Sequence, residues 1–412
     1  MQAESDRGRY VAEFRTHWRL LSAAALGMAT GTALNIFTVA LFAPSLIAEF
    51  GWSKSVFALH GTLALPFIFL GPVIGWLTDR YGVRRVAMVG IIGLPFTQIA
   101  ASFMTGSIAV YFGLSFFQLM LGGTTTAMVY SRIVALNFRE ARGLALAFVA
   151  SGTALMAALS SPLLGGIIDA YGWRTGYRCL AAFAAVSGLV VLLLMPSDLP
   201  ARAMASEGQG KVRMRDYVQV VRSRAFLLIA LGLCLCNMPH ALMTGQFKVM
   251  LLDRGLDSAS GSWILSLYSL GVVAGRFGCG LALDRFPSHI VAAVGLGFPA
   301  IGFFILGSPV ATLPVIVAAT ATMGLAQGAE IDLLAYMTAR HFASEVYGTV
   351  VSLIYGGMVV SATIGSVILS ATLHYTGSFV PFIMLLGVVS LIGASMFIPL
   401  GSGPRAPKPA AI

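Results

Sequence analysis

Apolar and polar positions follow one another along this chain in long blocks. Each apolar block holds about 20 residues or more, the length a helix needs to cross the hydrocarbon core of a bilayer. Short charged or glycine- and proline-containing stretches separate the blocks. The pattern predicts an all-α polytopic membrane protein with twelve transmembrane helices, near residues 20–47, 55–78, 84–104, 108–136, 142–168, 175–195, 225–251, 260–283, 289–307, 311–338, 345–372 and 378–400.

The longest polar stretch, 196–224, divides these spans into two sets of six. The first nineteen residues are polar and lack the short apolar core and cleavage site of a signal peptide, so we interpret them as a cytoplasmic tail. The expected organisation is an N-tail at 1–19, an N-terminal six-helix bundle at 20–195, a cytoplasmic central loop at 196–224, a C-terminal six-helix bundle at 225–400 and a C-tail at 401–412.

Composition and charge agree with this interpretation. The chain is 58% hydrophobic and 10% charged, whereas soluble domains are about 25% charged. Its net charge of +10 could indicate a nucleic-acid partner, but nineteen Lys and Arg lie in loops and tails on one side of the predicted topology and only four on the other. This asymmetry places both termini in the cytoplasm, in an inner or plasma membrane, and makes the lipid bilayer the partner rather than nucleic acid.

The two halves of the chain are copies of each other. A constant shift of 205 residues superposes Gly75 on Gly280 and Asp79–Arg80 on Asp284–Arg285, together with further glycines. Parallel repeats of this kind form transporters in which two pseudo-symmetric six-helix bundles rock about a site near the bilayer midplane. We find no nucleophile–base pair, metal-ligand cluster or phosphate-binding loop, so neither an enzyme nor a cofactor or metal is expected.

The stretch GWLTDRYGVRR at 75–85 lies between the second and third spans, and GLALDR at 280–285 is its copy. Positive-inside topology explains the arginines but not an aspartate and glycines at fixed positions. We expect Gly75 to let helices approach, and Asp79 to accept hydrogen bonds from a helix N-terminus or an arginine. The motif resembles the signature loop of the major facilitator superfamily, which implies a cytoplasmic gate formed by Gly75, Asp79, Arg80, Gly82, Arg84, Arg85, Asp284 and Arg285.

Residues 137–174 and 270–285 are similar to signatures of the monocarboxylate and oxalate/formate branch of that superfamily. In that branch an arginine on the eighth span binds the substrate carboxylate, a role that would fall to Arg276. Three features depart from the branch. The first span lacks the acidic Gly-Trp entry motif and the lysine of eukaryotic monocarboxylate carriers, Val272 stands where those carriers have an aspartate, and the eleventh span has no lysine to clamp a dicarboxylate. The resemblance implies a monomeric carrier that moves a small organic anion, above all a monocarboxylate, by alternating access with proton symport or anion antiport.

Two other functions stay open. A carrier of another small solute, such as a drug or an aromatic compound, has the same span pattern, and SSPLLGG at 160–166 partly matches the fifth-span motif of drug exporters. A membrane sensor that binds without translocating is less favoured, because such proteins usually carry a soluble output module and only short tails are expected here.

Apart from charges in the first turn of a span, five charged residues lie inside predicted spans, where burial is costly and a functional role is the default. Arg276 lies about two turns inside the Asp284–Arg285 loop, too deep to reach the interface if it faced lipid. Contact with the substrate and an ion pair with an acid of the tenth span are the two alternatives for it. Lys248 lies near the outer end of its span and is interpreted as a topological residue that reaches the interface. The five residues are Arg132, Lys248, Arg276, Glu330 and Asp332.

Glu330 and Asp332 differ by about 200° around a helix and cannot face the same cavity. Gln327 shares the face of Glu330, whereas Asp332 belongs to a stripe that leads to the tenth loop and is interpreted as a gate or structural ion pair. We expect Glu330 either to couple transport to protons or to form a charge pair with Arg132 or Arg276.

The 205-residue shift also maps Asn35 onto His240. Both are polar residues in apolar spans, the first and the seventh, which line the cavity in the superfamily. Together with Arg276, Arg132 and Gln327 they form the candidate substrate-binding set. His240 could also titrate near neutral pH and move a proton, and a hydrogen-bonded packing role is the alternative for this histidine.

Overall fold

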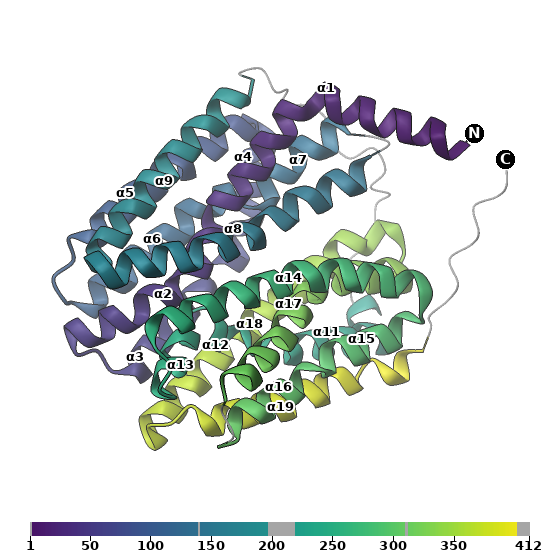
Figure 1. Ribbon diagram of the computed structural model, residues 1–412. Helices are drawn as coiled ribbons and strands as arrows, with labels where there is room; N and C mark the ends of the chain where they lie inside the picture. Colours follow the sequence, from purple (N-terminus) through teal and green to yellow (C-terminus); the bar gives the residue numbers. More distant parts are fainter. Residues whose placement is uncertain (1, 139–140, 197–218, 310–311, 402–412) are drawn as a thin grey trace. The chain divides into compact units, whose positions relative to one another are not determined.

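The computed structural model describes residues 2–138, 141–196, 219–309 and 312–401, and helices make up most of this part (Figure 1). The described residues fall into two compact units. Unit 1 takes its residues from Met1–Ser53, Leu63–Ala205 and Phe247–Ser266, and unit 2 from Lys54–Thr62, Ser206–Gln246 and Leu267–Ile412. Lys54–Thr62, from the first half of the sequence, therefore belongs to unit 2, and Phe247–Ser266, from the second half, belongs to unit 1.

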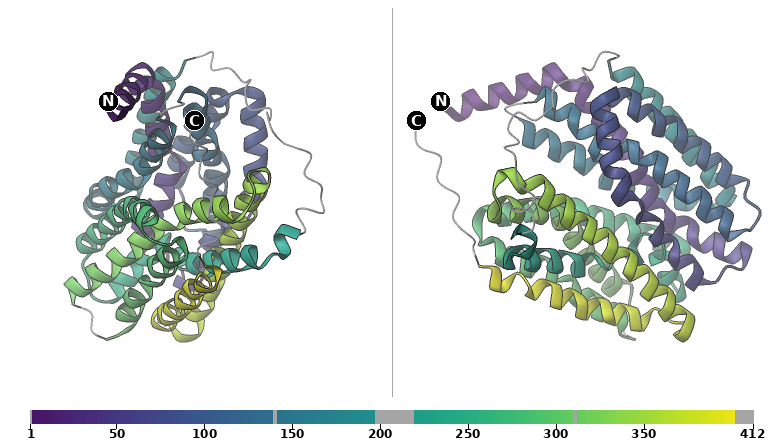
Figure 2. Two further views of the ribbon diagram at one scale, coloured as in Figure 1. Left: turned by 90° about the vertical axis from the view of Figure 1, so that its right-hand side faces the viewer. Right: turned by 180° about the vertical axis from the view of Figure 1, so that it is seen from behind.

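Unit 1 is a bundle of long helices joined by short turns. Helix α5 (Val83–Ser102) packs along α9 (Trp173–Leu194), and α1 (Gln2–Thr30) packs along α8 (Arg142–Tyr171) (Figure 2). The other members are α2 (Thr32–Phe50), α4 (Phe67–Tyr81), α6 (Ile108–Gly122), the 3-10 turn η2 (Gly123–Thr125), α7 (Ala127–Asn137) and α13 (Phe247–Asp253).

Unit 2 is a second helical bundle. Helix α11 (Arg224–Asn237) packs against α18 (Ser344–Thr376) and α19 (Val380–Ser395), and α17 (Leu313–His341) packs against α16 (Pro299–Gly307). Helix α14 (Ser258–Arg285) begins in unit 1 and continues in unit 2, and the 3-10 turn η1 (Leu59–Ala64) also belongs partly to each. The remaining elements are α3 (Lys54–Ala58), α12 (His240–Met243), α15 (Ser288–Gly297) and η3 (Ile398–Leu400).

Each unit has its own buried apolar core. In unit 1 the core includes Ile74, Val129 and Ile133, which join α4 to α7, and in unit 2 it includes Leu333 and Val350, which join α17 to α18. Van der Waals packing of such side chains fixes which face of each helix points inward, because lipid is as apolar as they are and supplies no hydrophobic driving force between helices.

Several predicted spans are broken rather than continuous. Gly31 separates α1 from α2, the stretch Gly122–Thr126 separates α6 from α7, and Pro239 marks the break between α11 and α12. Breaks at membrane depth require partners for the freed backbone groups. At the Gly31 break, the backbone N–H of Thr32 donates to Oγ1 of Thr125 at 3.0 Å, so one broken span satisfies another.

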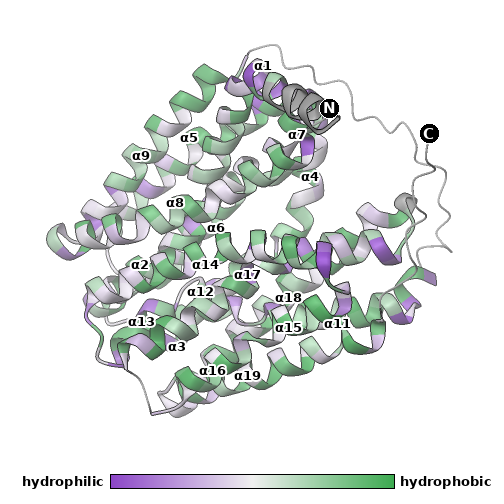
Figure 3. Ribbon diagram, turned by 45° about the vertical axis from the view of Figure 1, so that its right-hand side comes forward, coloured by the Kyte–Doolittle hydropathy of each residue, from purple (hydrophilic) through white to green (hydrophobic). Residues whose placement is uncertain are grey.

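Eleven segments of the described chain are long and apolar enough to cross a membrane, and they coincide with eleven of the twelve expected spans. The remaining expected span, the tenth along the chain at 311–338, is present as α17. In this helix of 29 residues, Gln327, Glu330 and Asp332 lower the mean hydropathy. Large apolar side chains are exposed along the helices of both units, as a lipid-facing surface requires. Figure 3 shows that hydrophobic residues predominate along these helices. The predicted all-α membrane fold is confirmed.

The expected N-tail differs from the structure in its local conformation. Residues 2–19 belong to α1, whose backbone departs from helical geometry at His17. In the expected central loop, residues 197–218 lie outside the described residues, and so do residues 402–412 of the expected C-tail.

Candidate functional site

Helices α14 and α17 touch along their backbones through four glycines, which we call the glycine seam: Gly271 and Gly275 of α14, and Gly324 and Gly328 of α17. A Cβ atom added at Gly324 would lie 3.1 Å from the Cα of Gly271, one at Gly275 would lie 2.0 Å from the α17 backbone, and one at Gly328 would lie 2.0 Å from the carbonyl oxygen of Val272. Only glycine allows so close an approach, and small residues are typical of such crossings in membranes. The contacts advance in the same order along both helices, so the helices run parallel.

The glycine seam places Arg276 beside Asp332. Arg276 lies one turn beyond Val272, and Asp332 lies one turn beyond Gly328. Nε of Arg276 is 3.5 Å from Oδ2 of Asp332, with the two side chains 19% and 36% exposed. This is an ion pair without a hydrogen bond, since Nε of Arg276 is buried with no hydrogen-bond partner among the described residues, and no hydrogen bond to them is seen from Nη1 or Nη2. Of the alternatives that the sequence left for Arg276, the ion pair with an acid of the tenth span is therefore present, and the outer edge of the guanidinium is available as well.

Glu330 forms a separate polar cluster in unit 2. Its side chain is buried, and Oε2 accepts hydrogen bonds from Nδ2 of Asn237 at 3.1 Å and from Nε2 of Gln327 at 3.2 Å. His240 begins α12, and its Nδ1 is buried without a partner among the described residues. Oε1 of Glu330 is buried without a partner among the described residues. As their spacing predicts, Gln327 and Glu330 share a face, and α11, α12 and α17 together build the cluster.

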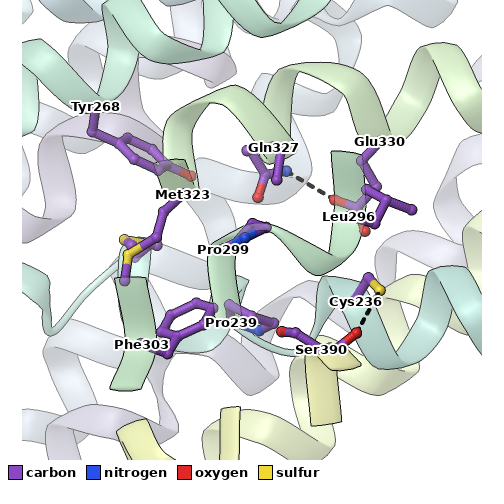
Figure 4. Close-up of a pocket in the computed structure, with 12 residues that line it drawn as sticks. Cys236, Pro239, Tyr268, Leu296, Pro299, Phe303, Met323, Gln327, Glu330 and Ser390 are labelled. Carbon is purple, nitrogen blue, oxygen red and sulfur yellow. Dashed lines mark hydrogen bonds between the residues drawn. The ribbon is translucent and has the colours of Figure 1, made fainter. Parts of the chain in front are cut away.

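A small cavity adjoins this carboxylate (Figure 4). Tyr268, Phe303 and Met323 line it together with Gln327 and Glu330, and it has room for about one water molecule. Figure 4 shows the amide of Gln327 directed at Glu330. A buried carboxylate with one unpartnered oxygen beside such a cavity can bind and release a proton without a change in its amide contacts.

Unit 1 contains an uncharged counterpart of this cluster. The 205-residue shift maps Thr32 onto Asn237 and Thr125 onto Glu330. In both halves the first residue donates a hydrogen bond to the side chain of the second, Thr32 from its backbone N–H and Asn237 from Nδ2. Thr125 also lines a small cavity. Each half thus joins its first and fourth spans by a polar link beside a cavity, but only the second half has an ionisable group there. The shift also maps Gly31, Ile91 and Leu94 of the unit 1 cavity onto Cys236, Leu296 and Pro299 of the unit 2 cavity.

Asn35 lies in the interior of unit 1 in a cluster of three amides. Its Oδ1 accepts hydrogen bonds from Nε2 of Gln98 at 2.7 Å and from Nε2 of Gln118 at 3.0 Å, and its Nδ2 donates to the carbonyl oxygen of Gly31 at 3.2 Å. Asn35 therefore has a hydrogen-bonded packing role in this structure. A contact with substrate stays a prediction, for Asn35 as for His240.

Arg132 pairs with Asp79 of the signature loop. Nε of Arg132 donates to Oδ1 of Asp79 at 2.8 Å and Nη2 donates to Oδ2 at 3.1 Å, while Nη1 donates to the carbonyl oxygen of Met128. The expectation that Asp79 accepts hydrogen bonds from an arginine is confirmed. With both edges of its guanidinium engaged, Arg132 is part of the loop's architecture in this structure, and its role in substrate binding stays a prediction.

The glycines of the signature loop differ in their roles. A Cβ atom at Gly75 would lie 3.6 Å from Nη2 of Arg132, an ordinary contact, and one at Gly280 would meet nothing within 4 Å. The expectation that Gly75 is needed for close helix approach is therefore wrong. Its carbonyl oxygen instead accepts a hydrogen bond from Arg132 at 3.2 Å. Gly82 has a φ of +83°, a conformation that other residues rarely adopt, and it connects α4 to α5.

The basic residues of the loop have several environments. Arg84 donates to the carbonyl oxygen of Met195 at the end of α9, which ties the loop to the sixth span. The guanidinium of Arg80 lies 5.2 Å from the ring centroid of Trp76, within reach of a cation–π interaction. Three further residues of the duplicated motif are exposed: Arg85, Asp284 and Arg285.

Lys248 differs from its prediction. Its side chain is only 1% exposed, so the interpretation as a residue that reaches the interface is wrong. Nζ of Lys248 donates to Oγ of Ser262 at 2.9 Å, and Oγ of Ser258, one turn earlier, donates to Oδ1 of Asp169 at 2.7 Å. A Cβ atom at Gly165 would lie 2.3 Å from Oγ of Ser262, so this glycine lets α8 approach closely enough to bury the lysine.

The sequence reasoning missed two features of these clusters. Asn237 was not considered, although the 205-residue shift pairs it with Thr32 just as it pairs Glu330 with Thr125. Gln98 was not considered either, and no repeat marks it, because Phe303 occupies the equivalent position. The first could have been found by extending the repeat comparison to every polar residue in a span.

Comparison with known proteins agrees with these observations. Residues 23–247 and 241–411 match the sequence profile of the Major Facilitator Superfamily. Human monocarboxylate transporter 11 is 25% identical over 77% of this chain and 69% of its own. The chloramphenicol resistance protein CraA of Acinetobacter baumannii is 26% identical over 65% of each chain.

A solved structure extends the likeness to the fold. The bacterial homologue of the human lysosomal transporter Spinster superposes with a TM-score of 0.71 at 14% identity, over 92% of this chain and 95% of its own. The duplicated signature loop, the twelve spans and the profile match lead to one conclusion: this chain is a membrane transporter that belongs to the Major Facilitator Superfamily.

Proposed function

We propose that this transporter moves a small organic anion, a monocarboxylate, across the membrane by alternating access. Arg276 carries the proposal, because its guanidinium lies about two turns inside α14 and 3.5 Å from Asp332, and no hydrogen bond to a described residue engages it. The outer edge of the guanidinium matches the two oxygens of a carboxylate, which can accept two parallel hydrogen bonds. The likeness to monocarboxylate transporter 11 supports the same substrate class.

In this proposal Glu330 links transport to protons. Its described hydrogen-bond partners, Asn237 and Gln327, are neutral amides, so no cation at hydrogen-bond distance offsets its charge. A buried charge without a counter-charge is costly, and a proton supplied during the transport cycle removes that cost. Anion exchange is the alternative mode, in which a second anion rather than a proton drives the return step.

The proposal also assigns the direction of the chain and the role of the duplicated motif. The protein lies in the inner or plasma membrane with both termini in the cytoplasm, and it works as a monomer. The signature loops then form the cytoplasmic gate, where the bidentate pair between Asp79 and Arg132 stabilises one of the two conformations.

Uptake into proteoliposomes tests the substrate class. Purified protein is reconstituted, and accumulation of labelled lactate, formate and benzoate is measured with and without an inward proton gradient. We expect uptake of at least one monocarboxylate, its stimulation by the gradient, and its loss in Arg276→Ala. Arg224→Ala serves as the matched control, because Arg224 is an exposed arginine at the start of α11. No carboxylate uptake by the wild type would refute the proposal.

A second candidate is export of an apolar or aromatic drug. The likeness to the chloramphenicol resistance protein favours it, and so does the apolar lining supplied by Tyr268, Phe303 and Met323. Chloramphenicol transport that is unchanged in Arg276→Ala, combined with no carboxylate uptake, would favour this candidate. Binding of either class without counterflow in vesicles would instead indicate a sensor.

A further inference from the structure

We propose that Asp332 is the positioning residue for the substrate carboxylate: it holds Arg276 from the neighbouring helix and makes the site selective for monoanions. This inference rests on the proposed function, whose substrate site it deepens. Asp332 need not touch the substrate to play this role, because it acts through the guanidinium.

The glycine seam fixes the geometry of the pair. Backbone contact at Gly328 sets the distance between α14 and α17, since a Cβ atom there would lie 2.0 Å from the carbonyl oxygen of Val272 and 2.8 Å from the backbone nitrogen of Arg276. One turn further along α17, Asp332 meets the Arg276 side chain. Because rigid backbones in contact set this arrangement, the carboxylate of Asp332 has a defined place beside the guanidinium.

The direction of approach leaves the functional edge of the arginine open. Asp332 contacts Nε at 3.5 Å, on the side of the guanidinium. With Asp332 on the Nε side, a bound carboxylate still has the two terminal nitrogens, Nη1 and Nη2, available for two parallel hydrogen bonds. An arginine held on one side keeps fewer rotamers, so less conformational entropy is lost when the anion binds.

The charges of the pair explain selectivity. Arg276 and Asp332 together are neutral, so a monoanion brings a single negative charge to the site. A dicarboxylate brings a second one, and a carboxylate already present beside the arginine repels it in the low dielectric of a membrane protein interior. Asp332 therefore disfavours dianions without any steric barrier.

The repeat supplies independent support. The 205-residue shift maps Arg276 onto Gly71 and Asp332 onto Ala127, so the equivalent helices of unit 1 carry no charge at these two places. The described ion pairs of unit 1 lie elsewhere, between Asp79 and Arg132 at the signature loop and between Glu49 and Arg174. An ion pair required only to hold these two helices together would be expected at matching depth in both copies, whereas the deeper pair exists in the second copy alone.

Moving the carboxylate to the other helix tests the proposal. Val272 lies one turn before Arg276 on the same helix, so an aspartate there can reach the guanidinium at i, i+4. Lactate uptake kinetics, and competition of lactate uptake by malonate, are measured in proteoliposomes for wild type, Asp332→Ala, Asp332→Asn and the double variant Asp332→Ala/Val272→Asp. Asp257→Asn, at the start of α14, is the control for loss of an acidic side chain.

We expect Asp332→Ala to raise the KM for lactate about tenfold, the effect of one lost charge-assisted contact, with a smaller change in the maximal rate. Val272→Asp should recover most of this loss. In Asp332→Asn, which keeps the shape of the side chain, malonate should compete about tenfold better relative to lactate. Melting temperatures in detergent identify any variant that fails to fold, and the asparagine variant then carries the test.

Three results would each overturn the proposal: an unchanged KM in Asp332→Ala, an unchanged malonate-to-lactate ratio in Asp332→Asn, or no recovery in the double variant. They are distinct from failure of the proposed function. If the wild type transports no carboxylate, the substrate class is wrong, whereas a wild type that transports lactate with unaffected variants refutes the role of Asp332 alone.

Discussion

Replacing Gly328 by alanine tests whether the glycine seam determines both stability and the site. The added Cβ atom would lie 2.0 Å from the carbonyl oxygen of Val272 and 2.8 Å from the backbone nitrogen of Arg276. An acceptable contact between carbon and oxygen is about 3.3 Å, so α14 and α17 must separate by about 1.3 Å. Neither obstacle is a flexible side chain that could turn away, so the helices themselves have to move.

The magnitude follows from two opposing effects. Overpacking of a well-packed contact costs about 1–3 kcal/mol, whereas alanine in place of glycine within a helix stabilises by roughly 0.5–1 kcal/mol. The net expectation for Gly328→Ala is a loss of about 1–2 kcal/mol in the free energy of unfolding. The same separation lengthens the contact of 3.5 Å between Arg276 and Asp332, so the KM for the transported anion should rise as well.

Gly278→Ala is the matched control. Gly278 lies on the same helix, α14, but a Cβ atom there would meet nothing within 4 Å, so only the favourable helix effect remains. Thermal unfolding of the purified proteins in detergent should rank Gly278→Ala at or above wild type and Gly328→Ala below it. A melting temperature of Gly328→Ala at or above that of the wild type would refute the close packing of α14 on α17.

Three further outcomes are expected. The Asp79→Asn variant should insert normally but transport about fivefold more slowly, since loss of one partly exposed ion pair changes a conformational equilibrium by about 1 kcal/mol. A wild-type transport rate in this variant would show that the signature loop only fixes topology. The double variant Asn237→Thr/Glu330→Thr places in unit 2 the residues found at the matching positions of unit 1, Thr32 and Thr125. It should still exchange labelled for unlabelled anion but should no longer be stimulated by a proton gradient. Stimulation that persists would exclude Glu330 as the proton carrier. Gly82→Ala should lower the melting temperature, because its φ of +83° costs about 1–2 kcal/mol for a residue with a Cβ atom; an unchanged value would show that the turn relaxes freely.

The sequence predicted the helices well because a bilayer imposes a strong and simple requirement. Each span needs about 20 apolar residues, and the charged stretches between them mark the ends. The 205-residue repeat was equally visible, since it depends on residue identity alone. The least apolar span, 311–338, was also predicted, although it contains both Glu330 and Asp332.

The partners of the charged residues were harder to predict. Arg132 and Asp79 are 53 residues apart, and nothing in the pattern says which of several acids the arginine meets. Lys248 shows the same limit, because its burial depends on Gly165 in a distant helix. Periodicity tells which face of a helix a residue occupies, but the helix that covers this face is decided by packing.

The polar link between the first and fourth spans exists twice in this molecule, once as Thr32 with Thr125 and once as Asn237 with Glu330. After a duplication, two copies of one junction are free to diverge, and here one copy kept hydroxyl chemistry while the other acquired an acid. The Thr32–Thr125 junction can therefore serve as an uncharged reference for the Asn237–Glu330 junction of the same chain. In each half, the residues of the junction can be replaced by those at the matching positions of the other half. Such exchanges separate the effect of the acidic side chain from that of the surrounding helices.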